Sequence, residues 1–274
     1  MDQTLRRLQL TQLKILQVID AFCKENHIRY SLYAGTLLGA IRHQGFIPWD
    51  DDLDICMERS EYERFLRLWE SQGPKGYLLQ NKENAPLFTQ SFSKIRKEHT
   101  TFLQAEWERG RYHTGIFVDI FPIDRMPSNT LGKRLFQWKA LNYQLLTREF
   151  IPPEALGPVK FISDLILKAV PETRRRQARE RDLLYLKRFH DASSPRVAIE
   201  TLASIRMPLP ADLMDQYVDG MFEGGWFPIF KNWDGYLRCK FGDYMTLPPM
   251  SERTWKHHPI ILDFEHDLEE LEHE

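Results

Sequence analysis

Cysteine is scarce in this sequence, and no stretch is apolar for long enough to cross a bilayer. The three cysteines among 274 residues lie far apart and form no Cys-x-x-Cys pair: Cys23, Cys56 and Cys239. This spacing argues against a disulfide framework and against a structural zinc site. The first residues also lack a signal-peptide pattern, so we expect the protein to work in a reducing cytoplasm.

A strong excess of one charge is also missing. The chain has 37 basic and 39 acidic side chains, and this balance does not indicate an extended nucleic-acid surface. Its 42% hydrophobic and 28% charged residues are ordinary for a globular protein that buries a sizeable core. The composition therefore excludes no enzyme that binds a single nucleotide.

The stretch from Tyr33 to Met57 combines a glycine turn, a basic residue and four aspartates, and we interpret it as the active site. Residues 28–34 alternate between apolar and polar side chains, which predicts a half-buried strand ending at Gly35. A Gly-Thr pair at a helix start presents backbone N–H groups and a hydroxyl to one side. Gly35 and Thr36 can therefore cradle a phosphate, and one or two helical turns should follow.

Two acidic side chains in the same stretch predict a metal site. Residues 52–57 alternate, so Asp52 and Asp54 should project from one face of a second strand. Neighbouring carboxylates repel each other, and Mg²⁺ or Mn²⁺ relieves this repulsion because hard cations prefer oxygen ligands. We favour this site over a solvated acidic turn. A calcium loop of the EF-hand type is discounted because Ile55 occupies the position that requires glycine.

Further candidates lie between residues 76 and 124. Short strand-like pieces are expected before residue 102, and Lys94 and Arg96 either guard a sheet edge or bind phosphates. The run Gly115–Asp124 is apolar almost throughout, as in a strand buried on both faces, and Asp119 interrupts it. A carboxylate there is costly unless it is paired or bound to metal, so Asp119 is the best third ligand.

The second half of the sequence is mainly helical. Hydrophobic spacing predicts helices at Leu131–Phe150 and Val159–Val170, and a third helix carries arginines between residues 174 and 181. An apolar helix beside an arginine cluster is typical of a membrane-surface patch, but equally of a core helix beside a solvated one.

The C-terminal part contains a dense aromatic stretch at residues 222–249, most of which is expected to be core. His257 and His258 have no further ligand spaced nearby and are expected at the surface. The acidic tail after residue 264 is expected to be frayed.

The run GTLLGAIRHQGFIPWDDDLD resembles the signature of the LicD family, which includes phosphocholine transferases and has fukutin-type ribitol-phosphate transferases among its relatives. The run GIFVDIFPID also resembles the family pattern. So does Gly-Asp-Tyr-Met followed by Pro-Pro at residues 242–249, although Phe230 and Phe241 depart from the pattern. The resemblance implies a fold similar to the DNA polymerase beta-like nucleotidyltransferases. Those proteins combine a Gly-Ser or Gly-Thr turn, an Asp-hydrophobic-Asp strand and a third carboxylate on a neighbouring strand.

We therefore expect an α/β fold (α+β in stricter usage). A nucleotidyltransferase-like mixed-sheet core should occupy residues 1–125, and a mainly helical part, residues 126–274, should close the site with its aromatic-rich segment. The resemblance implies metal-dependent transfer of phosphocholine from CDP-choline to a hydroxyl of a cell-surface glycan, a teichoic acid or lipopolysaccharide precursor. CMP would be released.

The resemblance and the residue patterns together assign roles to particular side chains. The catalytic metal ligands, for Mg²⁺ or Mn²⁺, would be Asp52, Asp54 and Asp119. Phosphate groups would be bound by Gly35, Thr36, Arg42, Lys94 and Arg96. Choline would be recognised by aromatic faces, for which the candidates are Trp226, Trp233, Tyr236 and Tyr244, with Glu223 or Asp234 as the counter-charge.

Three alternatives stay open at this point. The donor could be another CDP-linked alcohol such as CDP-ribitol. A metal-dependent glycosyltransferase also uses an Asp-x-Asp motif, but that motif does not predict the upstream Gly-Thr turn. A metal-stabilised binding protein without activity is the third alternative. A lipid-linked acceptor would bring the protein to the inner face of the membrane, and no nucleic-acid partner is expected.

Overall fold

The structure, a computed structural model, describes residues 2–148, 163, 165, 167–190, 193–199 and 202–272. Two compact units share the chain: residues 1–80, 93–122 and 212–274 form the first, and residues 81–92 and 123–211 form the second. The C-terminal segment thus belongs with the N-terminal residues, whereas the sequence pattern groups it with the helical part. Helices and a mixed sheet confirm the expected α/β class.

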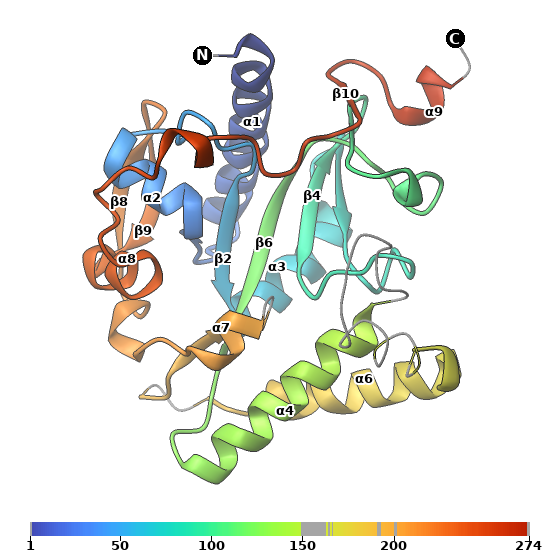
Figure 1. The fold of residues 1–274 in the computed structure, drawn as a ribbon, viewed down its shortest axis with the longest axis vertical. Coiled ribbons are helices and arrows are strands. Elements are labelled where there is room, and N and C mark those ends of the chain that lie inside the picture. Colours follow the sequence, from blue (N-terminus) through green and yellow to red (C-terminus); the bar gives the residue numbers. More distant parts are fainter. Residues whose placement is uncertain are drawn as a thin grey trace. The chain divides into compact units, whose positions relative to one another are not determined.

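A sheet lies at the centre of the first unit. Its strand order is β1 (Ser31–Leu32), β2 (Asp54–Glu58), β6 (Phe117–Arg125), β4 (Ser93–Lys97) and β3 (Tyr77–Gln80). Figure 1 shows β2, β6 and β4 side by side. The β6 strand is buried from Phe117 to Asp124, which confirms the prediction of a strand covered on both faces. Asp124 lies within this strand.

Two helices pack on this sheet. The first, α1 (Gln3–Glu25), contacts β4, and α3 (Arg59–Gln72) contacts β2 and β3. The ring of Phe22 packs edge-on against Phe65 and Trp69, which joins the two helices.

The two helices differ at their N-terminal ends. Asp2 caps α1 by accepting a hydrogen bond from the N–H of Thr4, while Thr11 donates its hydroxyl to the Arg7 carbonyl within the helix. The N-cap of α3 is Glu58, and Ser60 lies inside the helix.

The other elements of the first unit do not belong to this sheet. Their bounds are α2 (Ala34–His43), β5 (Thr101–Leu103), β8 (Tyr217–Phe222), β9 (Gly225–Phe230), α8 (Trp233–Phe241), β10 (Ile261–Asp263), α9 (Leu268–Leu271) and the short 3₁₀ helices Glu106–Glu108, Ala211–Leu213 and Met250–Glu252. The β8–β9 hairpin contacts β1 and α2. The β10 strand pairs with β5, and α9 follows it, so the described part of the acidic tail, residues 265–272, is not frayed as the sequence predicts.

The second unit is built around two helices. Its elements are α4 (Thr130–Thr147), α6 (Glu172–Leu186), α7 (Leu202–Arg206) and β7 (Arg196–Ala198), which pairs with the last residues of β6. Phe136, Tyr143 and Leu186 belong to its apolar core. The predicted helix Val159–Val170 lies largely outside the described residues.

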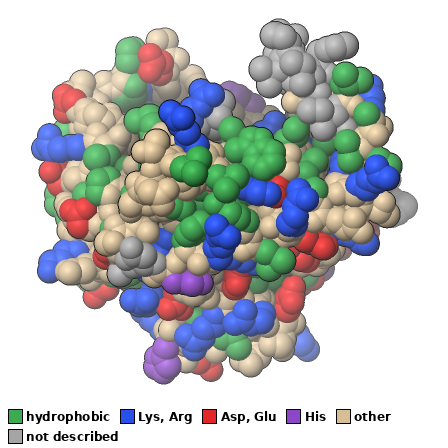
Figure 2. Space-filling view, turned by 90° about the horizontal axis from the view of Figure 1, so that it is seen from below, with side chains coloured by type: hydrophobic (Ala, Val, Ile, Leu, Met, Phe, Trp, Pro, Cys, Tyr) green, Lys and Arg blue, Asp and Glu red, His purple; other side chains and the backbone are tan. Residues whose placement is uncertain are grey.

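Charged side chains of α6 are partly paired within the helix. Arg175 lies 2.8 Å from Glu172, and Arg176 lies 4.0 Å from Glu180. On the face drawn in Figure 2, basic side chains are interspersed with acidic and hydrophobic ones. Among the described residues, no helix has the length and apolarity that a membrane span requires.

Removal of the Phe136 ring should destabilise the second unit. Phe136 is 0% exposed within α4, so Phe136→Ala should lower the free energy of unfolding by about 3–5 kcal/mol because a cavity forms. Leu131→Ala is the control, since Leu131 of the same helix is 80% exposed. Urea unfolding followed by circular dichroism measures both, and equal losses in the two variants would contradict the packing of α4.

Candidate functional site

The corner between β1 and α2 positions the two predicted phosphate-cradle residues. Ala34 has a φ of 46°, in the left-handed region, and its N–H donates to the Tyr236 hydroxyl at 3.4 Å. A Cβ at position 35 would lie 2.8 Å from Asp50 Oδ2, so a side chain there would displace the Asp50 carboxylate. The corner thus brings the backbone of Gly35 against an acidic side chain at the helix start.

Thr36 connects this corner to the acidic strand. Its hydroxyl oxygen accepts a hydrogen bond from the N–H of Asp54 at 2.8 Å, and the residue is 3% exposed. The side chain therefore holds the first residue of β2 in place. A phosphate contact of Thr36 stays a prediction.

The three predicted metal ligands lie where β2 and β6 meet. The N–H of Asp119 in β6 donates to the Leu53 carbonyl at 2.9 Å, and Leu53 is flanked by Asp52 and Asp54. Asp119 is far from Asp52 and Asp54 in the sequence, and the pairing of β2 with β6 brings them together. Asp54 and Asp119 are buried, and Asp52 is half-buried.

Electrostatic repulsion dominates the behaviour of these carboxyl groups. Burial raises the pKa of Asp54 well above its ordinary value, and the charges of Asp52, Asp119 and Asp50 raise it further. Burial and the Asp52 charge raise the pKa of Asp50 to about 7. The site therefore holds more negative charge than its surroundings compensate.

A divalent cation fits this donor set. Asp52 Oδ1 is buried without a hydrogen-bond partner, and hard carboxylate oxygens suit Mg²⁺ or Mn²⁺. Asp119 differs, because its Oδ1 lies 2.5 Å from Lys94 Nζ. No set of three oxygens, one each from Asp52, Asp54 and Asp119, has all its members within 4.8 Å of one another. In the described part of the chain, only His99, Asp267 and Glu270 meet that distance. Asp52 thus has an oxygen available to a cation, and the metal-ligand roles of Asp52, Asp54 and Asp119 stay predictions.

The three predicted phosphate-binding cations all have protein partners. Burial lowers the pKa of Lys94, although the charge of Asp119 opposes the shift. Arg96 is buried, and its guanidinium donates to the Gln80 side chain and to the Gly115 carbonyl. Arg42 Nη1 donates to the Tyr244 carbonyl at 2.6 Å. Their contacts with phosphate stay predictions.

Sequence reasoning missed two residues of the site, Lys256 and His257. Lys256 Nζ lies 2.9 Å from Asp50 Oδ1. Asp51 is 0% exposed and accepts hydrogen bonds from the N–H groups of Lys256 and His257, while His257 Nδ1 lies 3.1 Å from its Oδ1. His257 is therefore a site residue, not the surface histidine that the sequence predicts.

The carboxylates raise the pKa values of Lys256 and His257. Burial acts to lower the pKa of Lys256, but the charges of Asp52 and Asp50 raise it above its usual value. Burial likewise opposes the net rise in the pKa of His257, which the hydrogen bond to Asp51 and the charge of Asp52 cause. Lys256 thus supplies positive charge to the acidic cluster, which comprises Asp50, Asp51, Asp52, Asp54 and Asp119, and these carboxylates favour the charged form of His257.

The aromatic candidates divide into two pairs. Tyr236 is buried against the rings of Tyr33 and Phe230, and the buried Tyr244 donates its hydroxyl to Asp234 at 2.6 Å. Trp226 is 60% exposed and Trp233 is half-buried. The predicted counter-charge Glu223 forms an ion pair with Arg6 at 2.5 Å. Only the two tryptophans thus present much ring surface to a ligand.

An α/β protein whose central strands carry acidic side chains beside a strand-to-helix corner has the arrangement expected of the nucleotidyltransferase class. Comparison with protein families agrees. The LicD/FKTN/FKRP nucleotidyltransferase domain matches residues 27–162, which include this corner, β2 and β6. The chain belongs to the LicD family.

Three relatives add detail. The chain is 29% identical over 260 residues to the lipopolysaccharide cholinephosphotransferase LicD of Haemophilus influenzae, covering 93% of this chain and 96% of that protein. An uncharacterised protein of Rickettsia typhi is 32% identical over 88 residues, 30% of this chain and 28% of its own length. One of Rickettsia prowazekii is 68% identical over 31 residues, 11% of this chain and 12% of its own length.

The substitution Asp54→Asn should stabilise the metal-free protein at neutral pH. The pKa of Asp54 is raised in the folded state. Its favourable contribution to the free energy of unfolding is therefore present below the unfolded-state pKa of about 3.9 and is lost as the pH rises toward the folded-state pKa. With EDTA present, wild-type stability should therefore fall more steeply than that of the variant between about pH 4 and neutrality.

Urea unfolding at several pH values measures this difference. Asp219→Asn is the matched control, because Asp219 is an exposed strand carboxylate of β8, and it should follow the wild-type pH dependence. A gap between Asp54→Asn and wild type that does not change with pH would contradict the raised pKa.

Proposed function

We propose that this LicD-family enzyme transfers phosphocholine from CDP-choline to a hydroxyl of a cell-envelope glycan. In this reaction the hydroxyl oxygen forms a bond to the phosphorus that carries choline. The bond from this phosphorus to the oxygen that bridges it to CMP breaks, CMP leaves with that oxygen, and the hydroxyl proton passes to a base. The observation that carries the proposal is the extensive similarity to a lipopolysaccharide cholinephosphotransferase, together with the acidic cluster in the matched region.

The acidic cluster is the proposed position of the diphosphate. Asp52 and Asp54, with Asp119 as the third group, would hold Mg²⁺ or Mn²⁺. A bound ion would offset the charge of the diphosphate and orient its phosphates for in-line attack. The N–H groups at the start of α2, from Gly35 and Thr36, would bind a phosphate oxygen, since a helix leaves its first N–H groups without intrahelical partners.

Basic side chains around the cluster would bind the leaving nucleotide. The charges of Asp52 and Asp50 raise the pKa of Lys256 and so favour its charged form, and Lys94 faces the cluster from β4 through its pair with Asp119. Arg42 carries its charge on the last turn of α2. Cations held in fixed positions favour the charge that develops on the departing CMP without reorganising during the reaction.

The acceptor would be a hydroxyl of a cell-envelope glycan. A glycan of lipopolysaccharide is supported by the name of the Haemophilus relative, and a teichoic acid precursor would offer the same hydroxyl chemistry. A lipid-linked acceptor would place the reaction at the inner face of the membrane. The arginines of α6 would then be the groups that meet anionic lipid.

Asp52→Asn and Asp54→Asn should each reduce CMP release from CDP-choline by roughly 10²–10³-fold, the scale of losing one preorganised charge-stabilising group. Asp119→Asn should also reduce it, with a smaller loss because Lys94 already pairs with this carboxylate. The assay incubates the protein with Mg²⁺, an acceptor glycan and CDP-choline, CDP-ribitol or a UDP-sugar, and measures the released nucleotide.

Asp219→Asn serves as the control for the loss of a strand carboxylate, and thermal melting shows that each variant is folded. Near-wild-type turnover in Asp52→Asn or Asp54→Asn would overturn the metal assignment. Release from CDP-ribitol as fast as from CDP-choline would remove choline from the proposal, and release from a UDP-sugar alone would favour a glycosyltransferase.

Trp226→Ala should raise the KM for CDP-choline with little change in melting temperature. A quaternary ammonium is bound by aromatic faces, each worth about 0.5–2 kcal/mol, which corresponds to a roughly 2–30-fold rise in KM. Trp226 is 60% exposed, so its ring contributes little to the core, whereas Tyr236→Ala should lower stability by about 3–5 kcal/mol because Tyr236 is 0% exposed. Unchanged KM values in both Trp226→Ala and Trp233→Ala would place choline recognition elsewhere.

A further inference from the structure

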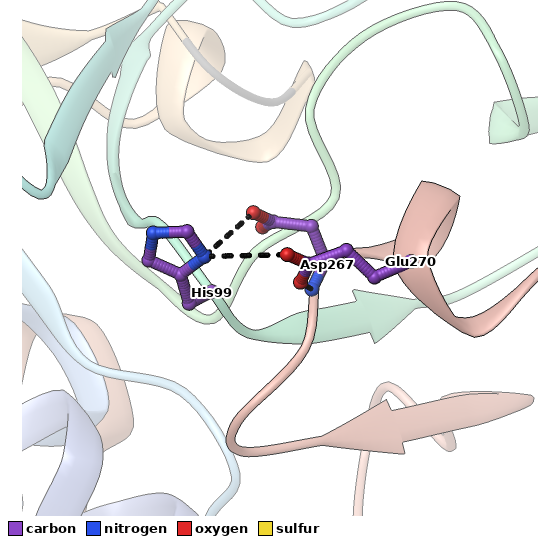
Figure 3. Close-up of side chains that lie close together, drawn as sticks. All are labelled: His99, Asp267 and Glu270. Atoms are coloured by element: carbon purple, nitrogen blue, oxygen red, sulfur yellow. Dashed lines mark hydrogen bonds and ion pairs between the residues drawn. The ribbon is translucent and has the colours of Figure 1, made fainter. Parts of the chain in front are cut away.

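A second group of metal-binding side chains lies in the first unit, apart from the acidic cluster. His99 is in the turn between β4 and β5, Asp267 precedes α9, and Glu270 lies within α9 (Figure 3). Each residue offers one ligand atom, and the three atoms lie within 4.8 Å of one another. His99 Nδ1 is 3.4 Å from Asp267 Oδ2 and 3.8 Å from Glu270 Oε1.

These separations fit a shared cation better than direct hydrogen bonds. An N–H···O bond brings its two heavy atoms to about 2.7–3.2 Å, and both His99 separations exceed that range. Ligand atoms at about 2.0–2.2 Å from one metal ion are separated by roughly 3–3.6 Å. The His99–Asp267 separation lies in this range and the His99–Glu270 separation, 3.8 Å, slightly exceeds it, so a small movement of the exposed Glu270 side chain would let the group bind one divalent ion.

Hydrogen bonds to the carboxylate oxygens that are not proposed ligands orient Asp267 and Glu270. Asp267 Oδ1 lies 2.9 Å from His113 Nε2, and the Gly115 N–H donates to the other nitrogen of that imidazole at 3.1 Å. Glu270 Oε2 accepts the Asp267 N–H at 2.7 Å. These contacts, together with the capping box in which the Asp267 side chain accepts the Glu270 N–H, fix both carboxylates beside His99, as second-shell partners do for metal ligands.

The backbone holds the two sides of this group together without a cation. On one side, the Thr100 hydroxyl donates to the Lys97 carbonyl and accepts the Ile116 N–H, which fixes the turn of His99. On the other, Asp263 pairs with Thr101 in the β10–β5 ladder. The ligand side chains therefore start from fixed backbone positions, and little chain ordering opposes metal binding.

We propose that His99, Asp267 and Glu270 form a divalent-cation site separate from the acidic cluster, with zinc as its preferred ion. One imidazole nitrogen and two carboxylate oxygens suit zinc, whereas Mg²⁺ favours oxygen ligands alone. Water would complete the coordination, because His99 and Glu270 are exposed. The ion would fasten the C-terminal segment to the β4–β5 turn.

Zinc titration calorimetry of the full chain, with Mg²⁺ in excess to occupy the acidic cluster, tests the site. His99→Asn and Glu270→Gln should each weaken zinc binding at least tenfold. His27→Asn is the matched control, because His27 is also exposed and also has a positive φ, 52° against 54° for His99. It should bind zinc as the wild type does, and asparagine tolerates that backbone conformation.

Two further measurements separate this site from the transferase reaction and from a folding defect. His113→Gln should keep the zinc stoichiometry but weaken affinity by about 10–100-fold, because only the support of Asp267 changes. CMP release with Mg²⁺ and the melting temperature without zinc should be unchanged in His99→Asn. Zinc binding of equal affinity in wild type and His99→Asn, or an equal loss in His27→Asn, would overturn the proposal.

Discussion

Repulsion between buried carboxylates is the constraint around which the first unit is arranged. Asp54 is buried at the start of β2, and Asp50, Asp52 and Asp119 are close enough to raise its pKa further. Charged carboxylates are costly in such surroundings unless cations or hydrogen-bond donors compensate them. Lys94 on one side and Lys256 on the other supply part of that compensation. The compensation is incomplete, because Asp52 Oδ1 is buried without a hydrogen-bond partner.

The compensating groups come from distant parts of the chain, and this explains why the first unit is discontinuous. The acidic residues lie close together at positions 50–54, but Lys94 reaches them from β4 and Lys256 from the C-terminal segment. The side chain of Asp51 contacts both the backbone N–H and the imidazole of His257, a residue of that segment 206 positions away. Each contact stabilises the acidic strand only when the chain has folded. The segment after residue 211 is thus part of the first unit.

The sequence predicted best what local pattern determines. Apolar residues on both faces identified β6, and the cost of a carboxylate within that run singled out Asp119, which lies beside the residues flanking Leu53. The role of His257 could not be predicted, because no spacing rule relates it to Asp51. The aromatic stretch was ambiguous for a different reason. Composition does not distinguish the buried Tyr236 from the exposed Trp226, since burial depends on which elements pack beside each ring.

One continuous C-terminal segment connects the two groups of acidic side chains. Its residues 256 and 257 hold Asp50 and Asp51, β10 then adds to β5, and Asp267 and Glu270 face His99 a few residues later. A fixed point at the end of such a segment limits the conformations open to the residues before it, so it favours the contacts that they make. The pairing of β10 with β5 therefore favours the contacts that residues 256 and 257 make with Asp50 and Asp51. The two groups differ in chemistry, because one is all carboxylate and the other contains imidazole.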